Sequence, residues 1–295
     1  MKEFKGRTAV ITGAASGIGR AIAEQCAREK MKVVLADIDE EALSQAEKEM
    51  KAAGASVLSV VTDVSRASDV ESLAQKTLAA FGAVHLLCNN AGVGGGTTIS
   101  ETTWASSMAN WKWVIGVNLW GVIYGVRVFV PIMLEQDSEC HIVNTASAAG
   151  LISGPQIGPY KVAKHGVVSL SETLYHDLTS IGAKINVSVL CPGAVNTRIM
   201  DAGRNRPPEL QNDPAWEERI MMSPEYQAGD QFIRQDLLQA GMSRQQVADC
   251  VFNAIREAKF YILTHPDWKI AVQMRMEDIL QERSPTNPMA SVLQE

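Results

Sequence analysis

A glycine-rich turn near the amino terminus constrains the fold more than any other stretch of the sequence. The β-branched run 8–11 ends in TGAASGIG at 12–19, and from Gly17 to Lys30 the apolar spacing becomes helical. Glycines in such a turn let a pyrophosphate approach the helix amino terminus, whose partial positive charge attracts anions. A second apolar strand follows at 32–36. This order of strand, turn, helix and strand predicts a dinucleotide-binding corner.

Strand-like and helix-like segments alternate along the whole chain. The patterns predict strands at 8–11, 32–36, 56–62, 85–88, 141–145, 185–190 and 260–263. Helices are predicted at 17–30, 40–53, 67–81, 111–134, 160–178, 243–258 and 270–280. The alternation predicts an α/β fold, a doubly wound seven-stranded parallel sheet with helices on both faces (a Rossmann fold), in a single domain over 1–295. Ligands of such sheets bind at the carboxyl ends of the strands, where the sequence places Gly13, Asp37, Asp63, Asn90, Ser147 and Pro192.

The composition and charge narrow the class of ligand. Apolar residues make up 46% of the chain and charged residues 20%, and the net charge is −6. A nucleic-acid-binding protein would need a basic face, so we expect a small-molecule ligand and no nucleic acid. The five cysteines are widely scattered and the histidines form no ligand motif, so we expect no metal. Scattered thiols and a charged segment 1–7 without an apolar leader indicate a cytoplasmic location.

One apolar run, 113–133, has nearly the length of a membrane span. It contains Arg127 and three glycines, and we interpret it as a helix buried on all sides rather than as a membrane segment. The sheet would cover one side of this helix, and a partner subunit would cover the other. We therefore expect no membrane association and a homodimer or a homotetramer.

Tyr160 and Lys164 stand four residues apart in the predicted helix 160–178, so both side chains should lie on one helix face. An ammonium beside a phenol favours the phenolate and lowers the phenol pKa from its ordinary value near ~10. A tyrosine with such a pKa can exchange a proton with an alcohol. An isolated pair of this kind is more often a solvated pair on a surface helix, so the interpretation depends on the rest of the chain.

Asp37 ends the second predicted strand, where this fold places an acid on the adenosine ribose. The alternative is that Asp37 caps the helix that begins with Asp39-Glu40-Glu41, and both roles are open for the pair Asp37 and Asp39. No Arg or Lys directly follows Asp37. A 2′-phosphate would meet a carboxylate without a neighbouring cation, so NAD is expected in preference to NADP.

These motifs together resemble the short-chain dehydrogenase/reductase family. The matching residues are TGAASGIG at 12–19, Asp63, NNAG at 89–92, Asn118, Ser147, Tyr160 with Lys164, and Pro192-Gly193 with Thr197. They follow one another in the order and spacing of the family. The resemblance implies hydride transfer between a nicotinamide cofactor and the carbon of a secondary alcohol or ketone.

The resemblance also implies roles for individual residues. Tyr160 would be the general acid/base, Lys164 would lower its pKa and bind the nicotinamide ribose, and Ser147 would hydrogen-bond the substrate oxygen. Asn118 would hold a water that links Lys164 to solvent, the alternative being a helix amide satisfied within the protein. Asp63 and Val64 would hold the adenine, and Thr197 the nicotinamide carboxamide. The remaining cofactor-binding residues implied are Gly13, Ser16, Gly17, Ile18, Gly19, Asp37, Ile38, Asn90, Ala91, Gly92, Pro192, Gly193 and Val195.

The last third of the chain is less regular. The segment 194–240 corresponds to the substrate lid of the family, and its Met and aromatic residues would suit a hydrophobic or aryl substrate, although they could equally pack the lid onto the body. The lengths of the lid and of the tail 281–295 are similar to those of bacterial relatives that oxidise benzylic alcohols. A second function is a non-catalytic NAD(H)-sensing protein on the same fold, which the presence of Ser147, Tyr160 and Lys164 disfavours.

Overall fold

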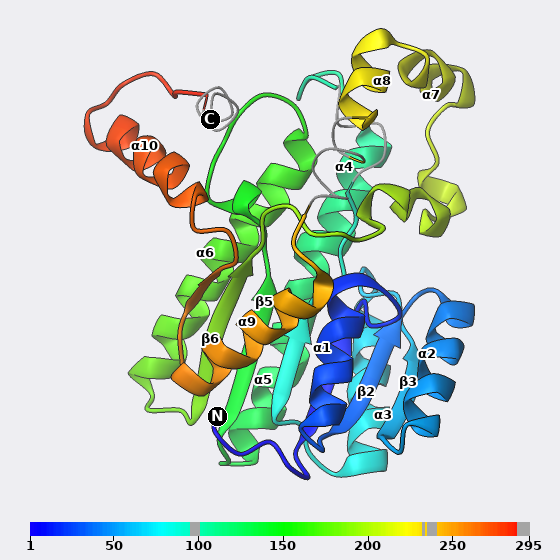
Figure 1. Ribbon diagram of the computed structural model, residues 1–295, viewed down its shortest axis with the longest axis vertical. Helices are drawn as coiled ribbons and strands as arrows, with labels where there is room; N and C mark the ends of the chain where they lie inside the picture. The colour runs from blue at the N-terminus through cyan, green and yellow to red at the C-terminus, as the bar shows by residue number, and fades with distance from the viewer. Residues whose placement is uncertain (95–100, 232–233, 235–240, 288–295) are drawn as a thin grey trace.

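The computed structural model describes residues 1–94, 101–231, 234 and 241–287. Seven parallel strands form one sheet in the order β3-β2-β1-β4-β5-β6-β7 (Figure 1). Their bounds are β1 Thr8–Thr12, β2 Lys32–Asp37, β3 Ser56–Val61, β4 Leu86–Asn89, β5 Cys140–Thr145, β6 Ile185–Cys191 and β7 Tyr261–Leu263. From β1 the chain adds β2 and β3 on one side and then β4 to β7 on the other, so the strand order reverses between β1 and β4. Doubly wound sheets bind ligands at this point. The predicted seven-stranded parallel sheet is confirmed.

Helices cover both faces of the sheet. Residues of α1 (Gly17–Arg28), α2 (Glu40–Ala52) and α9 (Arg244–Glu257) share one buried core with the strands. Residues of α3 (Ala67–Phe81), α5 (Gly121–Glu135) and α6 (Gly158–Ser180) share the core on the other face. Successive residues of β1 alternate between these cores, Ile11 facing the first and Val10 the second, because side chains alternate along a strand. Both faces of the sheet are therefore buried, as its uninterrupted apolar strands require.

Helix ends follow local signals in the sequence. Ser243 and Gln246 form a capping box at the start of α9, where a helix was predicted. Gly82 ends α3 in the left-handed conformation. Asp39 caps α2 by accepting a hydrogen bond from the Ala42 backbone N–H at 3.1 Å. Since Asp39 fills the capping position, Asp37 is not the cap of this helix.

The long apolar helix runs over 108–135, through α4 (Met108–Ile115), a π-helical turn η2 (Gly116–Trp120) and α5. By length and composition alone it could cross a membrane, but a third of its most apolar stretch is buried inside the protein (33%). Phe129 and Met133 are fully buried against the sheet, whereas Trp120 is 47% exposed. Burial on all sides is thus not achieved within one chain, because the sheet covers only one side of the helix. Cover of the exposed side by a partner subunit stays a prediction.

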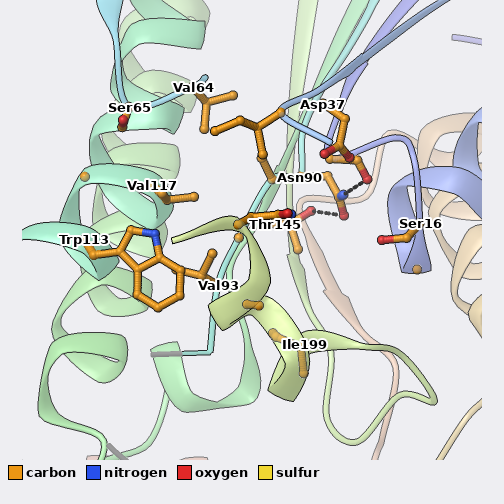
Figure 2. A pocket seen from close by; sticks show the side chains of 18 of the residues that line it. Ser16, Asp37, Val64, Ser65, Asn90, Val93, Trp113, Val117, Thr145 and Ile199 are labelled. Atoms are coloured by element: carbon orange, nitrogen blue, oxygen red, sulfur yellow. Dashed lines mark hydrogen bonds between the residues drawn. The ribbon is translucent and has the colours of Figure 1, made fainter. Parts of the chain in front are cut away.

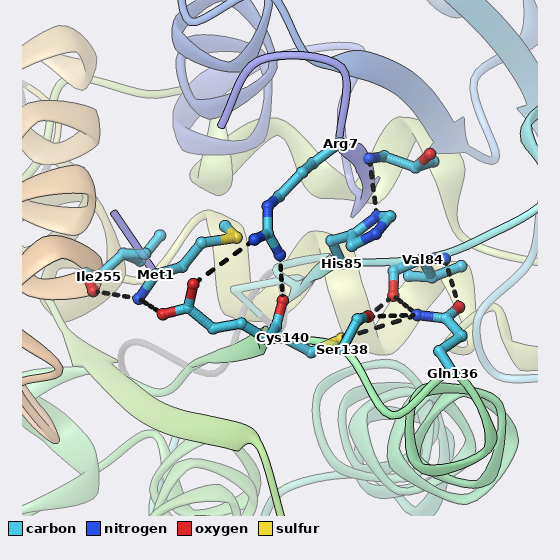
Figure 3. Close-up of polar contacts among 10 residues, drawn as sticks. Met1, Arg7, Val84, His85, Gln136, Ser138, Cys140 and Ile255 are labelled. Atoms are coloured by element: carbon cyan, nitrogen blue, oxygen red, sulfur yellow. Dashed lines mark hydrogen bonds and ion pairs between the residues drawn. The ribbon is translucent and has the colours of Figure 1, made fainter. Parts of the chain in front are cut away.

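Side-chain hydrogen bonds satisfy backbone groups at the amino ends of the strands (Figure 3). Gln136 bonds both backbone groups of Val84, accepting from its N–H at 2.7 Å and donating to its carbonyl at 2.8 Å. The Thr8 N–H donates to His85 Nδ1 at 3.1 Å, and Arg7 donates to the Glu139 carbonyl. This edge of the sheet is closed by the protein itself, so the opposite, carboxyl edge is where a ligand can bind.

The segment after β6 lies beyond the carboxyl edge, on the side of α4 (Figure 1). It contains the short helices η4 Ile199–Asn205 and η5 Pro208–Leu210, then α7 Pro214–Met221 and α8 Pro224–Gln231. No residue of α7 or α8 is buried. Residues 232–233 and 235–240 of the predicted lid lie outside the described residues, as do residues 288–295 of the predicted tail. Helix α10 (Trp268–Leu280) precedes that tail, as predicted.

Candidate functional site

A cavity of about 220 Å³ lies at the carboxyl edge of the sheet (Figure 2). Most of the predicted site residues line it: Gly13, Ser16, Gly17, Ile18, Asp37, Ile38, Asp63, Val64, Asn90, Ala91, Gly92, Tyr160, Lys164, Pro192 and Thr197. Figure 2 shows Ser16 and Asp37 on one side of this cavity and Trp113 and Val93 on the other. Residues that are up to 184 positions apart in the sequence, from Gly13 to Thr197, therefore meet in one site.

Five predicted residues lie behind the cavity wall: Gly19, Asn118, Ser147, Gly193 and Val195. A Cβ on Gly19 would stand 2.2 Å from the Gly13 carbonyl oxygen, so this glycine lets α1 pack against the turn. The Gly193 N–H is directed to His265 Nδ1 at 3.2 Å, and Val195 belongs to the buried core. Contact of these three residues with the cofactor stays a prediction.

The glycines of the glycine-rich turn let its backbone lie close to the NNAG segment. Gly13 has a φ of +65°, and a Cβ there would lie 2.8 Å from Ala91 Cα. Thr12 Oγ1 accepts hydrogen bonds from the N–H groups of Asn90 at 2.9 Å and Ala91 at 3.1 Å, which fixes the turn against the NNAG segment. Helix α1 begins at Gly17 without a side-chain cap and without an acid in its first turn. Its free N–H groups and dipole face the cavity and fit a phosphate group.

The Asp37 carboxylate lies at the end of the cavity next to this turn. It accepts hydrogen bonds from the backbone N–H groups of Ala15 at 3.0 Å and Asp39 at 3.1 Å. Burial raises the pKa of Asp37, and these two N–H donors oppose the rise in pKa. Arg204, in the segment predicted to be the lid, also lines the cavity and stands 3.7 Å from Asp39 Oδ2. Sequence proximity alone did not predict a cation here, because Arg204 follows Asp37 by more than 160 residues.

Tyr160 and Lys164 lie on one face of α6, as predicted. Lys164 Nζ stands 5.6 Å from the centre of the Tyr160 ring and donates to the Thr145 carbonyl at 2.9 Å. Burial lowers the pKa of Lys164 to about 8. The expected low pKa of Tyr160 is wrong for the protein without ligands. Burial raises the Tyr160 pKa because the phenolate is poorly solvated there, and the hydrogen-bonded Ser147 hydroxyl opposes the rise.

Ser147 and Asn118 contact the cavity residues from behind. Ser147 Oγ accepts from the Ala149 N–H at 3.1 Å, and its contact with the Tyr160 phenol leaves it beside the group it was predicted to assist. Asn118 is fully buried and bonds both backbone groups of Val93, accepting at 2.7 Å and donating at 2.9 Å. Its side chain is therefore satisfied within the protein, and the water relay through Asn118 stays a prediction.

Several lining residues were missed by the sequence interpretation. Thr145 lies at the carboxyl end of β5, a position that could have been found from the strand pattern. Arg198, Ile199, Ala202 and Leu210 also line the cavity and carry no such signal, because the predicted lid has no regular periodicity. Trp113 lines it from α4. Among the described residues, no group of three His, Cys, Asp or Glu side chains is placed to hold a metal ion. The lining set fits a dinucleotide, because the uncapped amino terminus of α1, the Asp37 carboxylate and the Tyr160–Lys164 pair share one cavity.

Comparisons with known proteins agree with this geometry. The family model described as "short chain dehydrogenase" matches residues 7–207. A solved short chain dehydrogenase/reductase from Burkholderia phymatum, in complex with NAD, is 50% identical, with a TM-score of 0.91 over 98% of this chain and 99% of that chain. A CLA biosynthesis dehydrogenase/reductase of Lactiplantibacillus plantarum is 33% identical over 97% of both chains. A C alpha-dehydrogenase of a Sphingobium species is 29% identical over 97% of this chain and 89% of the relative.

Proposed function

The chain belongs to the short-chain dehydrogenase/reductase family, and from this premise we propose that it is an NAD-dependent oxidoreductase of a secondary alcohol or ketone. One observation carries the proposal. The Tyr160–Lys164 pair shares a single cavity with the glycine-rich turn and with Asp37. A proton-transfer group and a dinucleotide site are thereby held at fixed separation on a rigid sheet edge, which is the arrangement that hydride transfer needs.

Proton transfer is assigned to Tyr160. When bound, the nicotinamide would accept the hydride from the carbinol carbon during oxidation, while the Tyr160 phenolate takes the hydroxyl proton. Burial raises the Tyr160 pKa, so the phenolate needs local stabilisation. The Lys164 ammonium over the ring and the Ser147 hydroxyl are the groups placed to supply it. In reduction the phenol returns the proton to the carbonyl oxygen.

NAD is proposed as the preferred cofactor. The Asp37 carboxylate, held by two backbone N–H groups, would accept a hydrogen bond from an adenosine ribose hydroxyl and repel a 2′-phosphate. The neighbouring cation Arg204 faces Asp39, which offsets its charge. The Burkholderia relative was solved with NAD, which supports this choice of cofactor.

The substrate proposed is a hydrophobic or aryl alcohol or ketone. Four apolar residues, Val93, Trp113, Ala202 and Leu210, line the cavity and pack in one cluster with Tyr160. Their position supports an apolar group attached to the reacting carbon. Relatives named as a 1-deoxy-11-beta-hydroxypentalenate dehydrogenase and a diacetyl reductase carry the same hydroxyl and ketone chemistry in their names.

The proposal extends to assembly and location. A homodimer or homotetramer is inferred from the exposed side of the helix 108–135, where Trp120 and Leu134 are accessible. A cytoplasmic location is inferred from five free cysteines, of which four are buried. No nucleic-acid or membrane partner is proposed, given the net charge of −6 and the packing of that helix on the sheet.

Tyr160→Phe provides the test, because it removes only the phenolic oxygen. Turnover of aryl, alicyclic and aliphatic secondary alcohols with NAD should fall roughly 10²–10⁴-fold in kcat, while NADH binding persists. Tyr175→Phe, on the exposed part of the same helix, is the matched control. Unchanged turnover in Tyr160→Phe would remove Tyr160 from the chemistry. NADH binding without turnover of any alcohol or ketone by the unmutated protein would favour the NAD(H)-sensing function instead.

A further inference from the structure

A buried polar cluster joins the lid to α4 behind the cavity. Its members are Glu101, Asn110, Arg206 and Asn212, none more than 7% exposed. Asn110 Nδ2 donates to the Glu101 carboxylate at 3.4 Å, and Asn212 Nδ2 donates to Asn110 Oδ1 at 3.3 Å. Arg206 donates from Nη2 to Asn212 Oδ1 at 3.1 Å. Buried polar groups are costly unless hydrogen-bonded, so this cluster specifies one arrangement of the lid on α4.

Arg206 connects this cluster to the cavity. Its guanidinium lies 4.9 Å from the centre of the Trp113 ring, within the range of a cation–π contact. Its Nε donates to the Leu210 carbonyl at 2.6 Å. Burial lowers the pKa of Arg206, and the carboxylates of Glu217 and Glu101 oppose that shift in pKa. One side chain therefore fixes both Trp113, on α4, and Leu210, in the lid.

Trp113 and Leu210 are two of the four residues we call the apolar wall, Val93, Trp113, Ala202 and Leu210. The apolar wall packs beside Tyr160. Its members Val93 and Trp113 lie on the side of the cavity away from Asp37 (Figure 2). Arg206 itself does not line the cavity, so it acts from behind the wall. In contrast, α7 and α8 of the same lid contain no buried residue and have no part in this surface.

We propose that the apolar wall binds the apolar group of the substrate and that Arg206 is the positioning residue that sets its shape. The inference rests on the proposed function and adds the residues that select the substrate. It predicts that loss of the Arg206 contacts lowers kcat/KM for substrates whose apolar group contacts the wall. The kcat/KM of substrates too small to reach the wall should not change. Cofactor affinity should change little, because Asp37 and Ser16 of the glycine-rich turn lie across the cavity from Trp113 (Figure 2).

The experiment compares 1-phenylethanol with 2-propanol, which share the carbinol and differ in the apolar group. In Arg206→Met, kcat/KM for 1-phenylethanol should fall roughly 10-fold or more relative to 2-propanol, mainly through KM, with NADH affinity retained. Arg206→Lys keeps the charge but loses the forked donor geometry, and should recover only part of the loss. Arg219→Met, on exposed α7, is the matched control and should leave the ratio unchanged.

Hydrogen exchange and a second variant make the outcomes separable. Amides of residues 199–212 should exchange faster in Arg206→Met than in Arg219→Met, and unchanged exchange would overturn the positioning role. Trp113→Leu removes the stacked ring but none of the hydrogen bonds from Arg206, so it should show the same loss of selectivity if Arg206→Met does not fold. An unaltered ratio in Trp113→Leu overturns the wall. If the unmutated protein oxidises no alcohol, the proposed function fails, but the inference can still be tested by acetophenone binding to the NADH complex. Weaker acetophenone binding in Arg206→Met and Trp113→Leu than in the unmutated protein supports the inference, and equal binding overturns it.

Discussion

Asp37→Asn should reverse part of the cofactor preference. The substitution removes one negative charge and replaces one of the two carboxylate oxygens by an amide NH2. The Ala15 N–H donates to Oδ2 and the Asp39 N–H to Oδ1, so one of these two hydrogen bonds is kept and the other is lost. Two effects of opposite sign follow. The ribose hydrogen bond to a charged acceptor, about 1.5–3 kcal/mol, is weakened, and NADH affinity should fall roughly 10-fold or more. The repulsion of a 2′-phosphate is removed, and NADPH affinity should rise.

The size of the NADPH gain follows from Coulomb's law. Two unit charges 4 Å apart interact by about 4 kcal/mol at the effective dielectric constant of ~20 near a protein surface, and mobile ions reduce this value. A gain of about 2–4 kcal/mol corresponds to a roughly 30- to 1000-fold tighter NADPH complex. Glu41→Gln removes an equal charge from an exposed position at the start of α2 and serves as the control.

Fluorescence titration with NADH and NADPH measures both affinities without turnover. The NADPH affinity of the unmutated protein should improve between about 50 mM and about 500 mM salt, because screening weakens repulsion, and Asp37→Asn should lose this dependence. Equal affinity for NADH and NADPH in the unmutated protein would refute the reasoning. So would an Asp37→Asn ratio no different from that of Glu41→Gln.

Three further predictions concern the proton-transfer pair, the assembly and the pH dependence of stability. Lys164→Met should weaken NADH binding and move alcohol oxidation to higher pH, because the Tyr160 pKa, already raised by burial, rises further without the ammonium; an unshifted pH–rate profile contradicts this. Light scattering should show a dimer or tetramer through the face containing Trp120, and a stable micromolar monomer would argue against it. Burial lowers the His141 pKa from 6.5 to about 3, so between these pH values the unfolded chain binds a proton at His141 and the folded protein does not. The free energy of unfolding in urea should therefore decline by up to about 1.4 kcal/mol per pH unit below ~6.5, and less steeply in His141→Gln.

The fold could be predicted because its turns and helix ends depend on residues that are neighbours in the sequence. The turn at 12–19, the capping box at Ser243 and the glycine that ends α3 are all local signals, and the helices begin or end at them. The Tyr160–Lys164 pair was predictable for the same reason, since helix periodicity alone puts both side chains on one face. The convergence of Gly13, Asp37 and Asn90 follows from parallel strands, whose carboxyl ends share an edge.

Other properties of the site could not be predicted, because they depend on the residues packed around a side chain and not on spacing along the sequence. The Tyr160 pKa is raised because the whole cavity desolvates the phenol, whereas the sequence indicated only its one charged neighbour. Gly193 and Val195 match a motif, and in this structure they contact His265 and the buried core, so their contact with the cofactor stays a prediction. Arg204 comes close to Asp39 from the predicted lid, whose path has no periodic pattern.

The two ends of the cavity therefore differ in how their side chains are held. At the end next to the glycine-rich turn, the side chains are held mainly by backbone groups. Two backbone N–H groups donate to Asp37, and the Asn90 N–H donates to Thr12 Oγ1. Few substitutions there can preserve binding, because a side chain added at Gly13 meets main-chain atoms. At the end proposed for the substrate, the side chain of Arg206 contacts Trp113 and Leu210 of the apolar wall. Side chains can change without moving the sheet, so substrate selection can vary in this protein while Tyr160 and Lys164 keep their geometry.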